Sequence, residues 1–256
     1  MKVIITLASF VLATLMVCAQ KQKTILVILA HPDDETAIGP VIARLTKENK
    51  VILITATDGR YGVREHAGNI KGDSLVTIRK KELQCSCNAL GIDSLIQLNY
   101  HDGMGSRTGV GEFFTQTKKM RAEIISIIKK THPDLIITFG PDGDTGHSDH
   151  RNISNIVTEI ILRESWVDKI PLYYLAWKKR QSNQLGGLGY MADEYINVAI
   201  QFSDEEEHVN WKALKCHWSQ YPEKEMQEWF DLDTNDKANT LYFRRFTVSK
   251  GIKNSF

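Results

Sequence analysis

An imidazole and two carboxylates lie close together in the stretch Ala30-His31-Pro32-Asp33-Asp34-Glu35. His31 and Asp34 offer one nitrogen and one oxygen ligand, a combination that suits a borderline metal ion such as zinc. Asp33 stands between them and is left free to move a proton. The same stretch also suits a plain turn, because proline followed by two aspartates is typical of turns and helix N-caps.

Two further histidines favour the metal site over the turn. His147 and His150 are three residues apart at the predicted start of a helix, so they project from the same face. The segment before them, 140–146, is rich in Gly, Pro and Asp and is typical of a loop. Three of the chain's eight histidines therefore fall in two short segments that each follow a predicted strand, and both segments could reach one metal ion.

Alternating apolar and amphipathic segments must position these residues. Strands are predicted at 24–29, 51–56, 94–98, 135–139, 171–177 and 195–200, with a late edge strand at 240–248. Helices are predicted at 36–47, 74–90, 113–130, 147–163 and 203–218. This alternation indicates right-handed βαβ units and a Rossmann-like three-layer α/β fold with a mainly parallel sheet. Because ligands bind at the carboxyl edge of such sheets, we expect the metal site at that edge.

Composition describes an ordinary globular protein. The chain has 256 residues, of which 42% are hydrophobic and 25% charged, and no linker is long enough to divide residues 20–256, so we expect one domain. The formal net charge of +1 gives no electrostatic reason to expect a nucleic acid or an anionic membrane as partner. The glycine-bearing stretch Gln181–Gly189 is predicted to be a flexible connection and a candidate mobile loop over the site.

The first nineteen residues are typical of a signal peptide. Lys2 provides a short basic start, and an uncharged apolar run extends from Val3 to Val17. Val17-Cys18-Ala19 resembles a cleavage site, which would leave Gln20 as the first residue of the mature chain. The run is short for a transmembrane helix, although an uncleaved anchor is an alternative. We expect export to the periplasm or the extracellular space, with no membrane span after cleavage.

Three cysteines remain after the signal peptide: Cys85, Cys87 and Cys216. An odd number leaves at least one thiol unpaired within the chain. Cys85 and Cys87 are two residues apart on a predicted helix and point away from each other, so no bond is expected between them. Buried, inert cysteines are the expectation, while the sequence leaves open whether any of them forms a disulfide.

The two histidine motifs, 30–35 and 146–150, resemble those of the PIG-L (LmbE-like) family of zinc-dependent N-acetylglucosaminide deacetylases. They stand on the same strand–helix pattern as in that family. The resemblance extends from about Ile25 to His150 and continues at Lys212–Gln220, which is similar to a late helix of the family. One departure is Ser148, where the family often carries proline.

The resemblance implies a role for each polar residue of the two motifs. His31, Asp34 and His150 would bind one zinc ion, or another divalent metal such as Fe²⁺. Asp33 would be the general base, and His147 would polarise the carbonyl and stabilise the oxyanion. Three protein ligands leave an open position for water, as in catalytic zinc sites, and the metal lowers the pKa of that water toward 7.

Substrate contacts are expected from three further residues. The resemblance places Asp102 at a family loop position near the substrate. It places Arg79 in an Arg-x-x-Glu pattern that is linked to substrate contact in the family. Arg60 lies in a glycine-bearing loop after a predicted strand and is a polar candidate for binding sugar hydroxyls. A solvated or salt-bridged surface position is the alternative for each of them. For His101 and His217 we expect such a surface position and no role in the site.

These observations predict an exported zinc hydrolase that removes the N-acetyl group from an acetamido sugar of the N-acetylglucosamine type. The substrate would be a small molecule or an oligosaccharide. One alternative keeps the metal but cleaves a non-sugar amide of the cell envelope, as an amidase or peptidase. Another is a carbohydrate-binding protein without turnover, against which the presence of Asp33 argues. The sugar, its linkage, the native metal and the oligomeric state are not determined by the sequence.

Overall fold

The computed structural model describes residues 22–104, 106–107, 109–187, 189–235 and 238–253, so the predicted signal peptide lies outside the described residues. The strands are β1 (Thr24–Leu29), β2 (Lys50–Thr57), β3 (Ser94–Tyr100), β4 (Leu135–Thr138), β5 (Leu172–Ala176), β6 (Val198–Gln201) and β7 (Thr240–Arg245). The α-helices are α1 (Gly39–Leu45), α2 (Gly72–Leu90), α3 (Val110–Thr131), α4 (Ser148–Arg163), α5 (Lys179–Gln184), α6 (Asp204–Leu214) and α7 (Glu223–Asn235). Short 3-10 helices are η1 (Asp34–Ile38), η2 (Asp193–Tyr195) and η3 (Lys215–His217).

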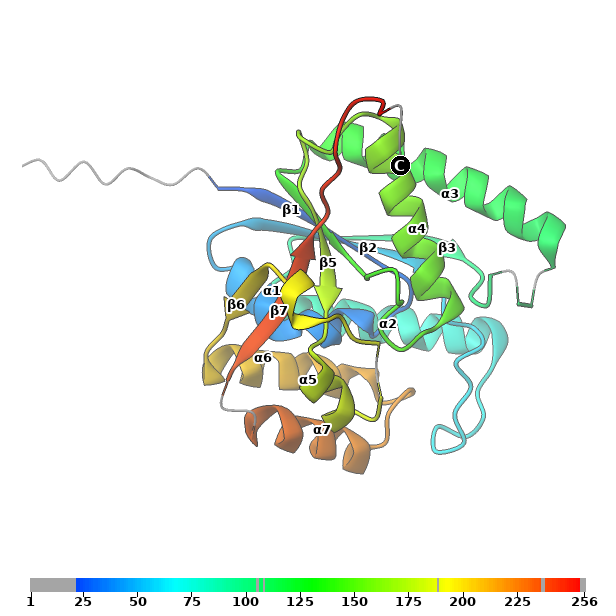
Figure 1. The fold of residues 1–256 in the computed structure, drawn as a ribbon. Coiled ribbons are helices and arrows are strands. Elements are labelled where there is room, and N and C mark those ends of the chain that lie inside the picture. Colours follow the sequence, from blue (N-terminus) through cyan, green and yellow to red (C-terminus); the bar gives the residue numbers. More distant parts are fainter. Residues whose placement is uncertain (1–21, 105, 108, 188, 236–237, 254–256) are drawn as a thin grey trace, which may run out of the picture.

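The described strands form one seven-stranded sheet in the order β3-β2-β1-β4-β5-β7-β6. Neighbouring strands from β3 to β5 are parallel, whereas β7 runs antiparallel to both β5 and β6. Figure 1 shows α3 and α4 on one face of the sheet and α1, α2 and α6 on the other, with α7 packed beyond α6. The predicted α/β fold with a mainly parallel sheet is confirmed.

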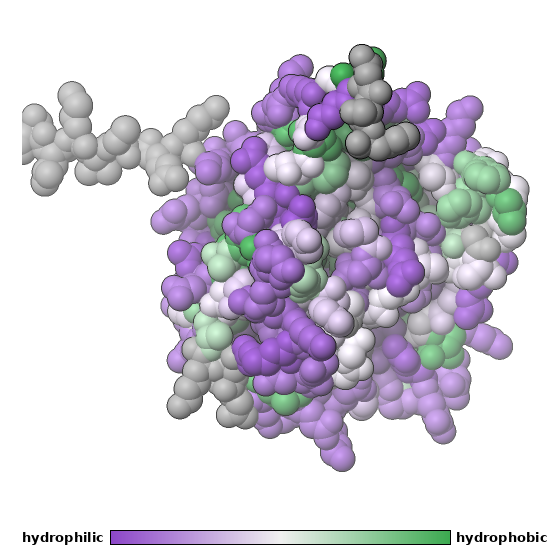
Figure 2. Space-filling view, in the orientation of Figure 1, coloured by the Kyte–Doolittle hydropathy of each residue, from purple (hydrophilic) through white to green (hydrophobic). Residues whose placement is uncertain are grey.

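The central strands are buried on both faces because both faces carry helices. Leu26, Val27 and Ile28 of β1 have no exposed surface, and neither do Leu53 and Ile54 of β2. Continuous apolar runs of this kind are typical of parallel strands that are covered on both sides. The front face of the molecule is largely hydrophilic, with hydrophobic residues gathered at the outer end of α3, where the described side chains Val110 and Phe114 are exposed (Figure 2).

Several predicted elements differ in detail. β7 was expected at an edge because its residues alternate, but β6 forms that edge and β7 lies between it and β5. The helix predicted at 36–47 begins as η1, and α1 follows only at Gly39, since Pro40 has no N–H for a continuous ladder. The stretch Gln181–Gly189, expected to be a flexible connection, begins within helix α5. The helix predicted at 203–218 starts at a capping box, as expected, but α6 ends at Leu214 and η3 follows.

The cysteine prediction is wrong for two of the three residues. Cys85 on α2 and Cys216 on η3 form a disulfide, while Cys87 is free and buried as expected. The two partners are 131 residues apart in sequence, and they meet only because η3 packs against α2. No local pattern could therefore have paired them.

Removal of this disulfide is expected to destabilise the protein. The bond closes a long loop, and cross-links of this kind typically stabilise by about 2–5 kcal/mol, mainly by restricting the unfolded chain. The double variant Cys85→Ser/Cys216→Ser should lose free energy of unfolding of that order in urea titrations. A reductant should destabilise the wild type equally and leave the variant unchanged. Equal stability of the wild type with and without reductant would contradict the assignment.

Candidate active site

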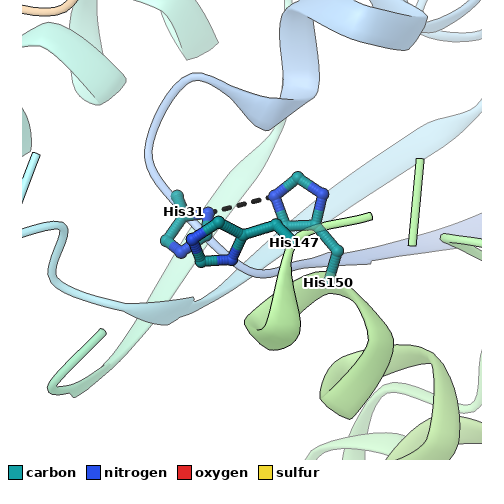
Figure 3. Close-up of side chains that lie close together, drawn as sticks. All are labelled: His31, His147 and His150. Atoms are coloured by element: carbon teal, nitrogen blue, oxygen red, sulfur yellow. Dashed lines mark hydrogen bonds between the residues drawn. The ribbon is translucent and has the colours of Figure 1, made fainter. Parts of the chain in front are cut away.

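The predicted metal ligands come from two neighbouring strands at the carboxyl edge of the sheet. His31 and Asp34 follow β1, while His147 caps the N-terminus of α4, whose first turn carries His150. Strand order reverses between β1 and β4, because the chain moves outward through β2 and β3 before it returns to β4. Open α/β sheets bind ligands at such a switch point. Figure 3 shows the imidazoles of His31, His147 and His150 close together there.

Two of these imidazoles face each other with nitrogens that cannot both be protonated. His31 Nδ1 and His150 Nε2 are 3.1 Å apart. The other nitrogen of His31 lies 3.1 Å from Asp149 Oδ2, and that of His150 lies 3.0 Å from the carbonyl oxygen of Gly143. Because both oxygens only accept, the neutral rings donate there and leave two lone pairs directed at each other. A cation between the two nitrogens removes that conflict.

Asp34 completes a set of donors that fits a metal ion. Its Oδ1 lies 3.2 Å from His150 Nε2, and its Oδ2 lies 3.6 Å from His31 Nδ1. Tetrahedral zinc with bonds of 2.0–2.1 Å places its ligands about 3.4 Å apart, which these separations approach. The backbone N–H groups of Ala30 and His31 donate to Asp34 Oδ2 at 3.0 and 2.7 Å, so the carboxylate is held in place.

The electrostatics of the pair point the same way. Burial disfavours a charged ring at His31, yet the carboxylates of Asp34 and Asp149 raise its pKa to about 10. Burial likewise disfavours the Asp34 carboxylate, but His150 and His31 bring its pKa well below the usual range. The cluster thus favours one positive charge between its rings and carboxylates. A metal ion bound there would supply that charge in place of a proton on His31.

Asp149 supports the cluster from behind, a role that the sequence did not reveal although the residue lies in the second motif. It is completely buried and accepts from the backbone N–H groups of Gly103 and Met104 at 2.7 and 2.8 Å. Its Oδ2 also accepts a hydrogen bond from His31 Nε2. Metal-binding histidines commonly donate their second nitrogen to a carboxylate in this way, which fixes the tautomer and the ring orientation.

His147 belongs to the cluster but differs from the other two histidines. One ligand atom each of His31, His147 and His150 lies within 4.8 Å of the others, so a three-histidine site is also possible on distance alone. However, the Nδ1 of His147 accepts the backbone N–H of Asp149 at 3.1 Å. The neutral ring therefore carries its proton on Nε2. Burial and the neighbouring His31 lower the pKa of His147, which keeps this ring neutral at pH 7 and its Nε2–H available as a donor.

Asp33 adjoins the cluster in an unusual backbone conformation. Its φ of 115° lies in the left-handed region, where strain often accompanies a functional site. The Asp33 Oδ2 accepts from the Tyr221 hydroxyl at 2.9 Å and lies 2.9 Å from Arg79 Nη2. Tyr221 and Arg79 thus fix the Asp33 carboxylate, which lies at the wall of a cavity. Tyr221 was not predicted as a site residue, because only the tertiary structure brings it to Asp33.

A buried network beneath Asp33 holds its backbone. The Asp33 N–H donates to Glu35 Oε2 at 3.0 Å, and Glu35 Oε1 contacts Ser86 Oγ at 2.5 Å and His217 Nε2 at 2.6 Å. Burial disfavours a charged His217 and a charged Glu35. The attraction between the imidazolium and the carboxylate outweighs this effect, so the pKa of His217 is raised and that of Glu35 is lowered. His217 is completely buried, so the surface position expected for it is wrong, because η3 packs its imidazole against the buried Glu35.

The three predicted substrate contacts occupy different places. Asp102 is buried at the cavity wall and accepts the backbone N–H of Tyr61. Arg79 also lines the cavity but is only 3% exposed, because its guanidinium contacts Asp33 and the carbonyl oxygens of two loop residues, Pro32 and Gly59. Arg60 pairs with Asp58 at 2.7 Å and is not among the residues that line the cavity. Its neighbour Arg64 lines the cavity instead.

A cavity of about 660 Å³ opens over the cluster. His31, Asp33, Asp34, His147 and His150 all line it. This volume is in the ordinary range for sites that enclose a drug-sized ligand. The predicted metal ligands, the predicted base and the predicted oxyanion donor therefore share one solvent-accessible site.

The fold and this site together define a Rossmann-like α/β protein with a polar cluster at the switch point of its sheet. Residues 26–161 match the model of the PIG-L family, described as GlcNAc-PI de-N-acetylase. This match covers more than half of the chain, and the chain belongs to the PIG-L family. The predicted family is thus confirmed, and with it the enzyme class, a deacetylase that hydrolyses an N-acetyl amide bond.

Two relatives illustrate the match in sequence. The first is a Bacillus cereus protein named "Probable N-acetyl-alpha-D-glucosaminyl L-malate deacetylase 2", which is 30% identical over 169 residues. That match covers 64% of this chain and 73% of the relative. The second is a 1D-myo-inositol 2-acetamido-2-deoxy-alpha-D-glucopyranoside deacetylase from Kineococcus radiotolerans, 28% identical over 150 residues. It is matched over 50% of this chain but only 42% of its own length.

Solved structures share the fold at lower identity. The N,N'-diacetylchitobiose deacetylase from Pyrococcus horikoshii aligns with a TM-score of 0.64 and 22% identity, over 88% of this chain and 84% of its own. GalB, a 4-carboxy-2-hydroxymuconate hydratase from Pseudomonas putida, aligns with a TM-score of 0.62 and 13% identity, over 92% of this chain and all of its own. Since a deacetylase and a hydratase share the architecture, the fold alone does not determine the reaction.

Proposed function

We propose that this protein is an exported, metal-dependent hydrolase that removes the N-acetyl group from an acetamido sugar of the N-acetylglucosamine type. The observation that carries the proposal is the convergence of His31, Asp34 and His150 in a cavity that Asp33 and His147 also line. The sequence relatives named for N-acetylglucosaminyl substrates support the choice of sugar. No specific contact in the site favours a non-sugar amide over a sugar.

In this proposal His31 Nδ1, His150 Nε2 and one oxygen of Asp34 hold a divalent metal, for which zinc is the first choice and Fe²⁺ an alternative. When bound, the metal would supply a Lewis acid that activates water and polarises the amide carbonyl. Asp33 takes a proton from the attacking water and later passes it to the departing amine, so that the C–N bond breaks to leave acetate and a free amino sugar. Arg79 and Tyr221 hold the Asp33 carboxylate during both transfers.

Loss of the His147 side chain is expected to slow turnover about a hundredfold. In the proposed mechanism its Nε2–H donates to the oxygen of the tetrahedral intermediate, and removing one such donor typically costs 10²–10³ in kcat. His147→Ala should lower kcat for acetate release by about that factor, with little change in KM and in bound metal. His208→Ala, on the exposed face of α6, is the matched control. Loss of the metal from His147→Ala would instead identify His147 as a ligand.

Asp102, Arg79 and Arg60 are proposed to contact the sugar, with different support. Asp102 has the strongest support, because it lines the cavity beside the cluster. Arg79 also lines the cavity, but most of its guanidinium contacts lie within the protein. The only support for a sugar contact of Arg60 is its position in the loop after β2. Arg64 of the same loop lines the cavity, whereas Arg60 does not.

Export is proposed from the first nineteen residues and supported by one feature of the fold. The disulfide between Cys85 and Cys216 is of a kind that persists mainly in oxidising compartments outside the cytosol. None of the helices within the described part of the chain is long and apolar enough to cross a membrane. Cell fractionation with N-terminal sequencing tests the proposal, and a protein found only in the cytosol with an intact N-terminus would overturn it.

The proposed activity is tested by acetate release from the purified protein. The substrates are N-acetylglucosamine derivatives that include chitooligosaccharides, and each is assayed with the native, the chelated and the zinc-restored protein. We expect acetate that disappears on chelation and returns with zinc. Zinc bound at one ion per chain with no acetate from any sugar would contradict the proposal and direct the search to non-sugar amides.

A further inference from the structure

The cavity extends well beyond the cluster, and its two ends differ in chemistry. One end, here called the polar half, is formed by the loops after β2 and β3 and includes Arg64, Asp102, Ser106 and Arg107. The other end lies among α1, α5, α6, α7 and β7 and is here called the apolar half. Its apolar residues are Ala37, Pro40, Leu185, Phe202, Leu214, Trp229, Leu232 and Leu241.

Polar side chains also line the apolar half, among them Gln181, Glu207, Asn210 and Gln220, and most of them already have partners within the protein. Gln181 Nε2 donates to the carbonyl oxygen of Thr240, and Gln220 Nε2 donates to that of Gly62. The Tyr221 hydroxyl is engaged by Asp33. Asn210 Oδ1 lacks a partner in the described part of the chain, but it packs so closely against α1 that a Cβ on Gly39 would lie 1.8 Å away. Most of the hydrogen-bonding groups at this end are therefore engaged within the protein, which leaves its apolar side chains as the main contacts for a ligand.

The two halves meet at the residues proposed to act on the amide. Tyr221 joins Asp33 to the apolar half, because its ring stacks edge-on against Trp229 at 4.7 Å while its hydroxyl contacts Asp33. Asp149 joins His31 to the polar half, because it accepts the N–H groups of the loop that carries Asp102. An amide held between Asp33 and the histidines thus has a polar space on one side and an apolar space on the other.

We infer that the apolar half accommodates an N-acyl chain longer than acetyl, so that the substrate class includes amino sugars with a medium-length N-acyl group. This inference rests on the proposed function. The sugar occupies the polar half with its hydroxyls, and the acyl chain extends from the carbonyl between α5, α6 and α7. Hydrolysis adds one water across the amide: the hydroxyl joins the acyl carbon, the C–N bond breaks, and the amine leaves with the proton, giving a carboxylate and the free amino sugar.

Size and chemistry both favour this occupant. A single acetamido sugar fills only part of a cavity of about 660 Å³, and an acetyl methyl group would leave the apolar half open to water. Each added methylene that enters an apolar pocket favours binding, and one such group typically changes specificity by about tenfold or more. The apolar side chains at this end favour a longer acyl chain, whereas a second sugar needs hydrogen bonds that most of the polar groups there already make within the protein.

The experiment compares N-acetyl-, N-butyryl-, N-hexanoyl- and N-octanoylglucosamine as substrates of the purified protein, with detection of the amine that all four release. We expect kcat/KM for the octanoyl compound to exceed that for the acetyl compound at least about tenfold. Binding is measured in parallel by calorimetry with the Asp33→Asn variant, which should prefer the octanoyl compound by a similar factor. This second readout does not depend on turnover.

A matched pair of variants localises the effect. Leu232 lines the apolar half and is 44% exposed, whereas Leu162 on α4 is 48% exposed and lies outside the cavity. Leu232→Asp should lower kcat/KM for the octanoyl compound about tenfold more than it lowers kcat/KM for the acetyl compound. Leu162→Asp should change neither value.

The outcomes separate the two proposals. Cleavage of the acetyl compound with no gain for longer chains, in turnover or in binding, would overturn the inference and leave the deacetylase proposal intact. Cleavage of none of the compounds would contradict the deacetylase proposal, while tighter octanoyl binding that Leu232→Asp removes would still support the apolar half as an acyl site. Preference for an octyl glycoside of N-acetylglucosamine over the N-octanoyl compound would assign that half to an aglycone and overturn the inference.

Discussion

Replacement of Asp33 by asparagine is expected to lower kcat for acetate release by about 10²–10⁴-fold, the usual contribution of a general acid–base residue. Asparagine has the same shape and keeps an oxygen that can accept from Tyr221 and Arg79, which hold the native carboxylate at 2.9 Å each. It cannot, however, take a proton from water. Because Asp33 is not among the proposed ligands, the variant should bind one metal ion per chain with unchanged affinity.

Steady-state kinetics and metal analysis of the same preparations test this expectation. Asp73→Asn makes the same chemical change at an exposed side chain on α2 and should retain full activity. A decrease in kcat at constant metal content supports proton transfer by Asp33. A kcat within about twofold of the wild type would remove Asp33 from the mechanism, and loss of the metal would reassign it as a ligand.

The second large effect is expected on stability, from the buried network under Asp33. Glu35→Ala leaves Ser86 Oγ, His217 Nε2 and the Asp33 N–H without their shared partner, in a region where Glu35 and His217 are no more than 1% exposed. Breaking a buried ion pair typically costs about 3–5 kcal/mol, because the remaining charge has no partner. We expect a decrease of that size in the free energy of unfolding.

Urea denaturation of three variants separates this effect from a general loss of charge. Glu205→Ala removes a carboxylate that is 82% exposed and 4.0 Å from Lys47 Nζ, and it should change stability by less than about 1 kcal/mol. Ser86→Ala removes one hydrogen bond of the network and should cost about 1 kcal/mol, which keeps the test informative if Glu35→Ala does not fold. A cost below about 1 kcal/mol for Glu35→Ala would show that the network contributes little.

The network also shows how segments from three parts of the chain meet at Asp33. Ser86 lies on α2, which also carries Cys85 and Arg79, whereas His217 lies on η3 next to Cys216. The disulfide fastens these two elements to each other, and Tyr221 follows shortly after η3. The segment from Cys216 to Tyr221 therefore contacts Asp33 twice, through Glu35 at the backbone and directly at the carboxylate.

Local pattern was sufficient for most of the fold and for the residues at the center of the site. The runs 24–29 and 51–56 form strands that are buried on both faces. Such strands need apolar residues at nearly every position, and this pattern is visible in the sequence. His31 and Asp34, like His147 and His150, are neighbours in sequence and follow predicted strands. Parallel topology then brings the two pairs to one edge, so the sequence by itself determined the cluster.

Only the tertiary structure decided the features that depend on distant segments meeting. The Cys85–Cys216 bond, the contact of Tyr221 with Asp33 and the position of β7 inside the sheet each join residues far apart in the chain, and no local periodicity encodes such pairings. The same holds for the contact of Arg79 with Asp33, which the sequence pattern around Arg79 did not indicate. Side-chain types and spacing specify which chemistry is possible, whereas long-range packing selects which groups stand close enough to perform or support it.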